Sequence, residues 1–367
     1  MSDTFRWSCE QNRQEEAGRY GNAGLARMDS RSNNLPVELT VGSYRMHFRA
    51  MESVRLPAYA GSAWRGALGH ALRRLFCVTR KDDCAACLLY RACGYAYVFE
   101  TPPPLETGKL RKYPAAPHPF VLMPGSVGGM APAGSLFVLG LSLFGRGNDF
   151  LPYFIHALAQ AAGRGIGGQR HRLQLERVEQ CAPDGEKWFS IYDGDGACRA
   201  LPPAVPVPPP LPETVSVELE TPLRVKCEGS VLGPETFSFG AFFSNLLRRI
   251  SLLTYFHGET PLETDFKGLV AAARAIEIQD RVLEWFDWKR YSSRQGQEMK
   301  LGGMLGQFRL RGADIAPFWP YLWLGQFVHA GAVTTMGLGR YRLIMQEHNL
   351  PEARFGWQTS DGMEVEA

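Results

Sequence analysis

Hydrophobic and polar residues alternate near the start of the chain, over residues 37–48, and again over residues 215–225. Strict alternation is typical of a β-strand with one buried face, so we expect a strand at each place. Each stretch leads into a segment with helical periodicity and a matching core, GALGHALRRL at 66–75 and GAFFSNLLRRI at 240–250. The two halves of the chain therefore begin with the same pair of elements.

The two halves also end alike. An apolar helix, a glycine-rich turn and a basic strand close the first half at 165–173 (GIGGQRHRL) and the second at 337–343 (GLGRYRL). In the second half, alternation at 280–291 and a glycine-interrupted stretch at 298–310 predict a middle hairpin with bulges at its glycines. The shared order favours a duplicated β-α-β-β-α-β unit. We expect an α+β fold of two tandem ferredoxin-like (RRM-like) domains.

Seven prolines lie between residues 201 and 212. Such a run favours extended polyproline geometry and a semi-rigid spacer. We therefore predict a first domain at 35–200, a linker at 201–212 and a second domain at 213–350. Residues 1–34 are rich in Gln, Asn, Gly, Ser and Arg without an apolar period, which predicts a mobile N-terminal tail. Residues 351–367 are expected to form a C-terminal tail.

Composition places few limits on function. Hydrophobic residues make up 45% of the chain and charged residues 21%, as in ordinary globular proteins, and the net charge is only +3. No window reaches the ~18 apolar residues of a membrane span, and the N-terminus lacks a secretory pattern. We therefore expect a cytoplasmic protein without a membrane partner. Basic residues nevertheless cluster in short stretches, which either bind phosphate or form solvated faces.

One predicted helix of the first half carries candidate catalytic groups. On a helical wheel, His70 falls opposite the apolar stripe, with Arg73 and Arg74 one turn later. Gly66 and Gly69 fall on the same outer side. Because glycine costs roughly 1 kcal/mol inside a helix, we expect a close approach there by RNA or by a neighbouring protein element. The stripe expected to face the core comprises Trp64, Ala67, Leu68, Ala71, Leu72, Leu75 and Phe76.

A histidine beside two arginines suits metal-free RNA cleavage. That reaction needs a base for the 2′-hydroxyl, an acid for the 5′-leaving oxygen, and cations for the charge that develops on phosphate. Neighbouring positive charges favour the neutral, basic form of histidine. The alternative is a surface histidine without a role, and the helical pattern alone does not separate the two.

Four cysteines follow that helix in the spacing C-x6-C-x2-C-x5-C: Cys77, Cys84, Cys87 and Cys93. The close pair is typical of half a tetrahedral zinc site, and four thiolates complete one. We therefore predict a structural zinc ion that staples the loop, and no catalytic metal. Disulfides are not expected in a cytoplasmic chain. The alternative is four small, partly buried thiols.

Other segments combine features of nucleic-acid contact. The predicted hairpin tip at 289–295 (KRYSSRQ) joins cations, an aromatic ring and small hydroxyl donors, which fits an RNA backbone with one stacked base. The two glycine-rich turns offer backbone amides to phosphate, beside Arg170, Arg172, Arg340 and Arg342. A solvated hairpin and two tight turns are the competing interpretations. Neither turn stands in the strand–turn–helix order of a dinucleotide site.

Five motifs stand in order along the chain. They are LPAYAGSAWRGALGHALRR (56–74), the cysteine cluster ending CGYAYVFE (93–100), YPAAPHPF (113–120), RYSSRQ through GGMLG (290–306), and TMGLGRY (335–341). In this combination, residues 35–343 resemble the CRISPR-associated repeat-RNA (pre-crRNA) processing endoribonucleases of the RAMP superfamily.

The resemblance implies two tandem ferredoxin-like domains that cradle a repeat stem-loop or single strand. It also implies metal-independent cleavage that leaves a 2′,3′-cyclic phosphate and a 5′-hydroxyl. His70 occupies the place of a histidine that members often use, and Tyr59 is the nearest candidate for their tyrosine. Members often add a lysine, but none accompanies this helix before Lys81, so Arg74 is expected to supply the charge. His47 is a reserve candidate.

The resemblance also implies partners, namely CRISPR repeat RNA, the mature crRNA and other subunits of a CRISPR effector complex. Two alternatives stay open: a non-catalytic crRNA-binding subunit of such a complex, and a zinc-stapled protein-interaction module unrelated to RNA. The residues expected to bind RNA are Arg65, Arg73, Arg170, Arg172, Lys289, Arg290, Arg294, Gln295, Arg340 and Arg342.

Overall fold

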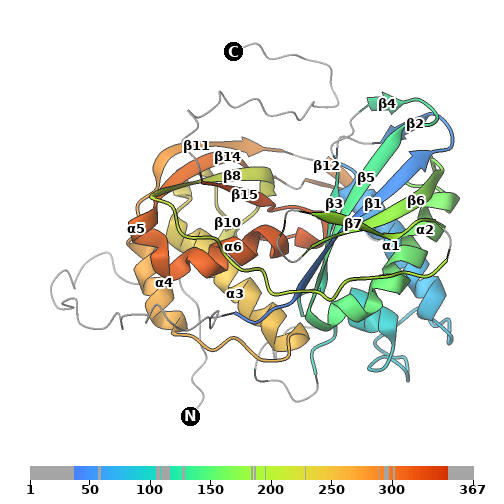
Figure 1. The fold of residues 1–367 in the computed structure, drawn as a ribbon, viewed down its shortest axis with the longest axis horizontal. Coiled ribbons are helices and arrows are strands. Elements are labelled where there is room, and N and C mark those ends of the chain that lie inside the picture. Colours follow the sequence, from blue (N-terminus) through green and yellow to red (C-terminus); the bar gives the residue numbers. More distant parts are fainter. Residues whose placement is uncertain are drawn as a thin grey trace.

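The computed structural model describes residues 37–345 with short gaps, which are 57–58, 105–107, 109–115, 126–128, 183–184, 186, 195, 228, 288, 293–296 and 301. The two predicted tails lie outside the described residues. Within the described part, two α+β units lie side by side (Figure 1). No helix in this part of the chain is long and apolar enough to cross a membrane.

The first unit is built on a five-stranded antiparallel sheet in the order β3-β5-β1-β6-β7. Apart from the edge strand β7, the main elements follow one another as β-α-β-β-α-β. Across the sheet, the four strands of this repeat stand in the ferredoxin-like order second-third-first-fourth. The elements are β1 (Val41–Ala50), α1 (Gly61–Phe76), β3 (Phe120–Pro124), β5 (Leu136–Phe144), α2 (Leu151–Arg164), β6 (Leu173–Cys181) and β7 (Trp188–Tyr192). Smaller elements are β2 (Val54–Leu56), paired with β4 (Gly129–Ala131), and the short helices η1 (Ala96–Glu100) and η2 (Gly145–Phe150).

The second unit repeats this arrangement in a four-stranded antiparallel sheet, β11-β14-β8-β15. The predicted α+β fold is therefore confirmed, and both sheets have the strand order of ferredoxin-like domains. The main elements are β8 (Thr214–Leu223), α3 (Phe239–His257), β11 (Gln279–Phe286), β14 (Gly303–Arg311), α6 (Trp319–Val328) and β15 (Tyr341–Ile344). Additions to the repeat are β9 (Lys226–Cys227), β10 (Ser230–Val231), η3 (Pro234–Thr236), α4 (Phe266–Arg274), β12 (Lys289–Ser292), β13 (Gln297–Lys300), α5 (Gly312–Ile315), η4 (Ala316–Phe318) and η5 (Thr334–Met336).

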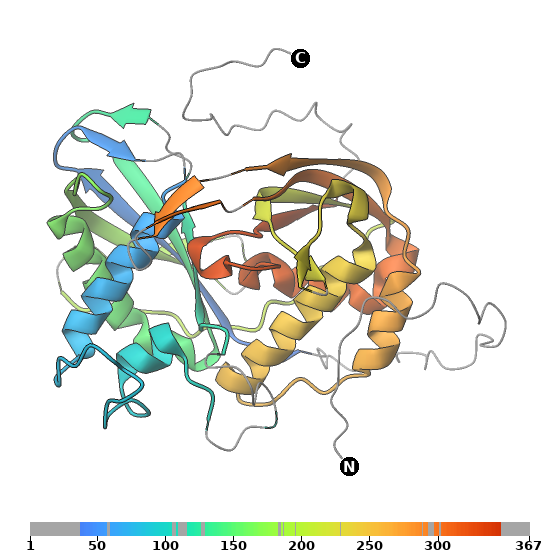
Figure 2. The same ribbon diagram turned by 180° about the vertical axis from the view of Figure 1, so that it is seen from behind.

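The alternating pattern of β1 accounts for the core of the first unit. Tyr44, Met46 and Phe48 point to the buried face of the sheet. Trp64 and Leu68 of α1 belong to the same apolar cluster, and the rings of Phe48 and Trp64 lie 4.9 Å apart. Both long helices of this unit lie on one side of its sheet (Figure 2). The buried face of β1, which follows from its alternating pattern, therefore packs against the apolar stripe of α1, which follows from the helical period of 3.6 residues.

The predicted inner face of α1 is confirmed at its centre and wrong at its end, where Leu75 is 40% exposed. Gly69 was expected on the outer surface, but it is buried. A Cβ at this position would meet the ring of Phe99 in η1 at 2.5 Å. The glycine is therefore explained by a neighbouring protein element, whereas Gly66 faces open space.

The predicted middle hairpin of the second unit is divided into two parts. β11 pairs with β14 in the main sheet, and β12 pairs with β13 beyond it. The expected irregularity at the glycines is confirmed, because the register of β14 against β8 shifts between Met304 and Gly306. Gly306 has a φ of +121°, a conformation that only glycine adopts without strain.

The proline-rich stretch 201–212 forms no helix or strand, apart from one bridge residue, and it is attached to both units. The Ala204 carbonyl accepts a hydrogen bond from the Val41 N–H at 2.8 Å, and the Pro209 carbonyl accepts one from Trp319 Nε1 at 2.8 Å. Val41 and Phe144 of the first unit also belong to the main apolar cluster of the second. The linker is therefore fixed along two units that share buried apolar surface.

Candidate functional site

The outer face of α1 presents His70 and Arg74 to solvent. Both side chains are exposed and lie one helical turn apart, as the wheel predicts. Within the described residues, His70 makes no hydrogen bond and no ion pair. The imidazole is therefore accessible to a ligand that arrives from solvent, with a guanidinium on the same face of the helix.

Arg73 has a different environment. Its guanidinium donates hydrogen bonds to the backbone carbonyls of Lys81 and Asp82, the second at 3.2 Å. The Asp82 carboxylate lies 3.7 Å away. This arginine, which was expected to bind RNA, thus holds the cysteine-containing loop against the end of α1.

Tyr59 is buried where the two units meet. Its hydroxyl donates a hydrogen bond to the Met336 carbonyl in the second unit's glycine-rich turn. The adjacent Gly337 has a φ of +94°, and a Cβ there would meet the Leu122 carbonyl oxygen at 2.6 Å, so only glycine fits. Burial raises the pKa of Tyr59 far above its usual value. This geometry favours a structural role, although the resemblance suggested a catalytic one.

Tyr59→Phe is expected to lower the free energy of unfolding by about 1 kcal/mol, because one buried hydrogen bond is lost while the ring still packs. RNA cleavage should stay within about threefold of the wild-type rate, since a change of that size is under 1 kcal/mol. Urea unfolding and single-turnover cleavage measure the two quantities. A hundredfold slower cleavage with unchanged stability would instead support the catalytic role.

Arg65 links α1 to the second unit. Its Nε donates to Thr335 Oγ1 at 3.0 Å, its Nη2 donates to His118 Nε2 at 3.3 Å, and its guanidinium lies 4.4 Å from the centre of the Phe99 ring. Because arginine only donates, His118 Nε2 is the acceptor, so Nδ1 carries the hydrogen and donates to Thr101 Oγ1 at 2.6 Å. Burial, and then the charge of Arg65, lower the pKa of His118 to about 3.

Two further histidines are fully buried near this junction. His257 Nε2 donates to the Pro117 carbonyl at 2.7 Å, and its Nδ1 accepts from the Tyr97 hydroxyl at 3.0 Å. His329 Nδ1 donates to the Leu338 carbonyl at 3.1 Å. Burial lowers the pKa of His257 to about 4 and that of His329 to about 3. Both rings are therefore neutral near pH 7.

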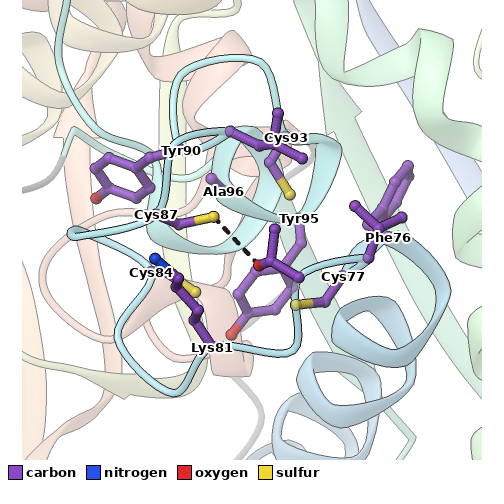
Figure 3. Close-up of a pocket in the computed structure, with 12 residues that line it drawn as sticks. Phe76, Cys77, Lys81, Cys84, Cys87, Tyr90, Cys93, Tyr95 and Ala96 are labelled. Atoms are coloured by element: carbon purple, nitrogen blue, oxygen red, sulfur yellow. Dashed lines mark hydrogen bonds between the residues drawn. The ribbon is translucent and has the colours of Figure 1, made fainter.

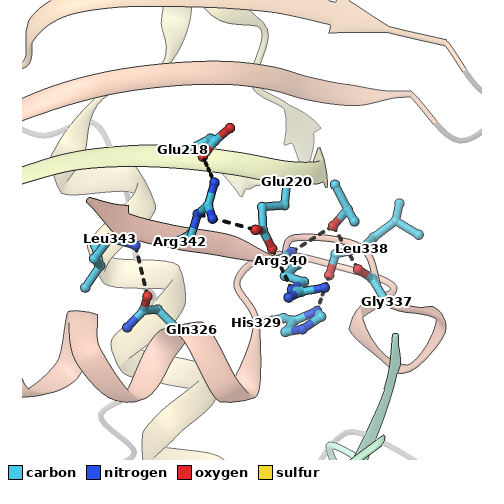
Figure 4. Close-up of polar contacts among 10 residues, drawn as sticks. Glu218, Glu220, Gln326, His329, Gly337, Leu338, Arg340, Arg342 and Leu343 are labelled. Carbon is cyan, nitrogen blue, oxygen red and sulfur yellow. Dashed lines mark hydrogen bonds and ion pairs between the residues drawn. The ribbon is translucent and has the colours of Figure 1, made fainter. Parts of the chain in front are cut away.

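Arg340 and Arg342 follow the second glycine-rich turn and pair with carboxylates of β8 (Figure 4). Arg340 Nε lies 2.6 Å from Glu220, and Arg342 Nη2 lies 2.7 Å from Glu218. Both arginines remain exposed. Phosphate binding at this turn therefore has to compete with surface ion pairs, which are individually weak.

The other predicted basic sites are less closely defined. Arg170 and Arg172 are exposed in the first glycine-rich turn, where the Arg172 backbone N–H donates to Glu52 at 3.0 Å. Lys289 and Arg290 lie on β12, while Arg294 and Gln295 are outside the described residues. Figure 2 shows this hairpin reaching from the second unit towards the first, on the side of the molecule that carries α1. The reserve candidate His47 hydrogen-bonds Glu179 at 2.8 Å across the sheet.

The four predicted metal ligands line one pocket between the end of α1 and η1 (Figure 3). Thr79 Oγ1 lies 3.3 Å from Cys87 Sγ, and this hydrogen bond lowers the pKa of the thiol, whereas burial raises the pKa of Cys84. In the described part of the chain, no three His, Cys, Asp or Glu side chains are arranged to hold a metal ion. The cysteines are thus gathered in one place without forming a closed ligand set.

Comparison with known families links part of the chain to a known class of protein. Residues 217–341, from within β8 to the start of β15, match the family model of the CRISPR-associated endoribonuclease Cas6. This region is therefore similar to Cas6 endoribonucleases. Residues 39–203 match a second family model, described as an N-terminal domain. No curated protein matches this sequence.

A solved Cas6 structure shares the fold. A Cas6 product complex has a TM-score of 0.52 at 16% identity, over 83% of this chain and 99% of that chain. A partial Cas6-RT-Cas1–Cas2 complex gives 0.49 at 15% identity, over 85% of this chain and 47% of that chain. Thermus thermophilus Cas6 gives 0.46 at 15% identity, over 83% and 99%. At these identities only the first score supports an argument, and that argument concerns the fold alone.

The sequence analysis missed three histidines near the junction of the two units. His118 stood inside the motif YPAAPHPF without a role, and His257 and His329 were not singled out. No local signal marks them, because their partners Tyr97, Pro117 and Leu338 are distant in sequence or lie in turns. Their neutral state depends on tertiary burial, which periodicity does not report.

Proposed function

We propose that the chain cleaves CRISPR repeat RNA at one site to release crRNA, without a catalytic metal. The match of residues 217–341 to the Cas6 endoribonuclease family carries this proposal. The accessible His70 beside Arg74 on α1 supports it with chemistry suited to a phosphodiester. Release of the product, or its retention within an effector complex with other subunits, are both compatible with the fold.

In the proposed reaction, the His70 imidazole takes the proton of a 2′-hydroxyl. The resulting oxygen attacks the adjacent phosphorus, and the bond from phosphorus to the 5′-oxygen breaks. The products are a 2′,3′-cyclic phosphate and a 5′-hydroxyl, whose oxygen takes up a proton from a second acid. Arg74 stabilises the negative charge that grows on the phosphate oxygens in the transition state.

We propose that RNA is held by the exposed arginines of both glycine-rich turns and by the basic hairpin. Arg170 and Arg172 would contact the backbone directly, whereas Arg340 and Arg342 would exchange their carboxylate partners for phosphate. Arg65 acts indirectly in this proposal, because its guanidinium positions the second glycine-rich turn through Thr335.

One observation favours the alternative of a non-catalytic crRNA-binding subunit. Among the described residues, no second acid–base side chain is in hydrogen-bonding contact with His70, and the Tyr59 hydroxyl is engaged with Met336. A subunit that only holds RNA would need the same fold and the same basic turns.

The full chain should cut repeat-containing RNA at a single site in the presence of EDTA. Mapping both product ends tests the chemistry, with a cyclic phosphate on one fragment and a 5′-hydroxyl on the other as the expected result. A scrambled RNA of equal length is the control. Tight binding without cleavage would support the alternative of a non-catalytic crRNA-binding subunit. Cleavage only after addition of Mg²⁺ would contradict the metal-independent reaction.

A further inference from the structure

We propose that Cys77, Cys84, Cys87 and Cys93 bind one zinc ion in a structural four-thiolate site. The four side chains come from three places, namely the end of α1, a turn within the loop and the residues just before η1. All four line the same pocket, and Figure 3 shows their sulfur atoms around one shared space. This site is separate from the proposed cleavage chemistry and does not depend on it.

The pocket lining selects the kind of metal. It contains the four thiols and Thr79 together with apolar and aromatic side chains, and Lys81 is its one charged residue. No carboxylate or imidazole lines it. Soft sulfur ligands without oxygen or nitrogen competitors favour zinc over magnesium, calcium or manganese. Four ligands also fill the tetrahedral shell, so the ion would have no open position for catalysis.

The central pair of cysteines is already held in a tight turn. The Cys87 N–H donates to the Cys84 carbonyl at 3.0 Å, and the Ala85 N–H donates to Asp83 Oδ1 at 2.9 Å. A C-x2-C turn of this kind places two sulfurs on the same side of the backbone, as a zinc knuckle requires. Cys77 and Cys93 then stand at the two ends of the loop.

The loop has little else to hold it in place. None of the residues 77–94 is buried, and Leu88 and Val78 are 92% and 76% exposed. The residues that are partly shielded from solvent include all four cysteines. A segment without an apolar core gains little free energy from burial to offset its conformational entropy. Metal ligation supplies that free energy in small units of this kind.

Closing the site requires side-chain movement, because no three of these ligands are yet arranged to hold a metal ion among the described residues. With zinc–sulfur bonds of about 2.3 Å, tetrahedral ligands lie about 3.8 Å from one another. Cys87 would exchange its contact with Thr79 for the metal, and four thiols would release four protons to solvent. The resulting site carries a net charge of −2. Lys81 and the guanidinium of Arg73, bonded to the loop carbonyls, are close enough to offset part of it.

Metal analysis and thiol mapping on the full chain test the site. The wild-type protein, purified or refolded with ZnSO₄ under reducing conditions, should hold one zinc ion per chain. The double variant Cys84→Ser, Cys87→Ser should hold none, and the matched control Cys181→Ser should hold one. Substitution with Co²⁺ should give the visible absorption of a tetrahedral thiolate complex.

A second measurement needs no variant. In the native wild-type chain, removal of zinc should speed alkylation of the four cysteines by at least about tenfold, since metal-bound thiolates are shielded. Cys198 serves as the internal control, and its alkylation should not change. Equal alkylation of the four cysteines with and without zinc would overturn the proposal. Iron in place of zinc, or full zinc retention in the double variant, would overturn it as well.

Discussion

His70→Ala is expected to slow single-turnover cleavage of repeat RNA by about 10²- to 10⁴-fold, the usual contribution of a positioned general base. The imidazole is exposed on α1 with Arg74 one turn away, so its removal leaves the helix and its buried face intact. Binding should be nearly unchanged, because the guanidinium groups proposed to contact phosphate remain in place. Cleavage under enzyme excess and a binding titration measure the two quantities.

His156→Ala is the matched control for that experiment. His156 is an exposed histidine on the neighbouring helix α2, and its loss should leave the cleavage rate unchanged. Cleavage by His70→Ala at the wild-type rate would remove this residue from the mechanism. The reaction would then have to be assigned to another group, with His47 constrained by its bond to Glu179.

The second large effect concerns stability in mild acid. We expect the free energy of unfolding to fall by about 5 kcal/mol between pH 6.5 and pH 5, from His118, His257 and His329 together. Their pKa values in the folded chain are about 3, about 4 and about 3, so all three stay neutral in this window. In the unfolded chain they take up protons below about pH 6.5. The unfolded state therefore binds more protons, and stability is lost as the pH falls.

Burial is the main cause of the low pKa of His257. The Pro117 carbonyl, which accepts a hydrogen bond from the ring, opposes this shift, and the guanidinium groups of Arg146 and Arg249 add to it. Urea unfolding followed by tryptophan fluorescence from pH 5 to pH 7 measures the slope. His257→Gln, which keeps a donor and an acceptor, should reduce the slope by about a third. If the free energy of unfolding of the wild-type chain did not change between pH 5 and pH 7, these rings would have to take up protons in the folded state as well.

Much of the fold follows from periodic patterns in the sequence. Alternation at the starts of both halves gave β1 and β8, and the repeated order of elements gave two sheets with the same strand order. The repeated helix cores were a weaker guide, since Gly66 lies in the middle of α1 whereas Gly240 lies in the first turn of α3. The two units therefore share the order of their elements, although matching residues do not occupy the same positions in their helices.

The candidate site was only partly predictable. The wheel placed His70 and Arg74 correctly, because exposure on a helix depends mainly on its period. It wrongly predicted that Gly69 is exposed. The ring of Phe99, thirty residues further along the chain, packs over Gly69, and the helical period of α1 contains no information about this contact. The partners of Arg65, Arg73 and Tyr59 were likewise set by tertiary contacts. Residue type and sequence position singled out these residues as candidates but did not predict their partners.

The apolar contact between the units makes the packing of each depend on the other. Leu39 and Phe144 of the first unit are fully buried within the cluster that forms the second unit's core. A change of side-chain volume at either position therefore alters the packing of both units. Neither core can be redesigned without adjusting the other.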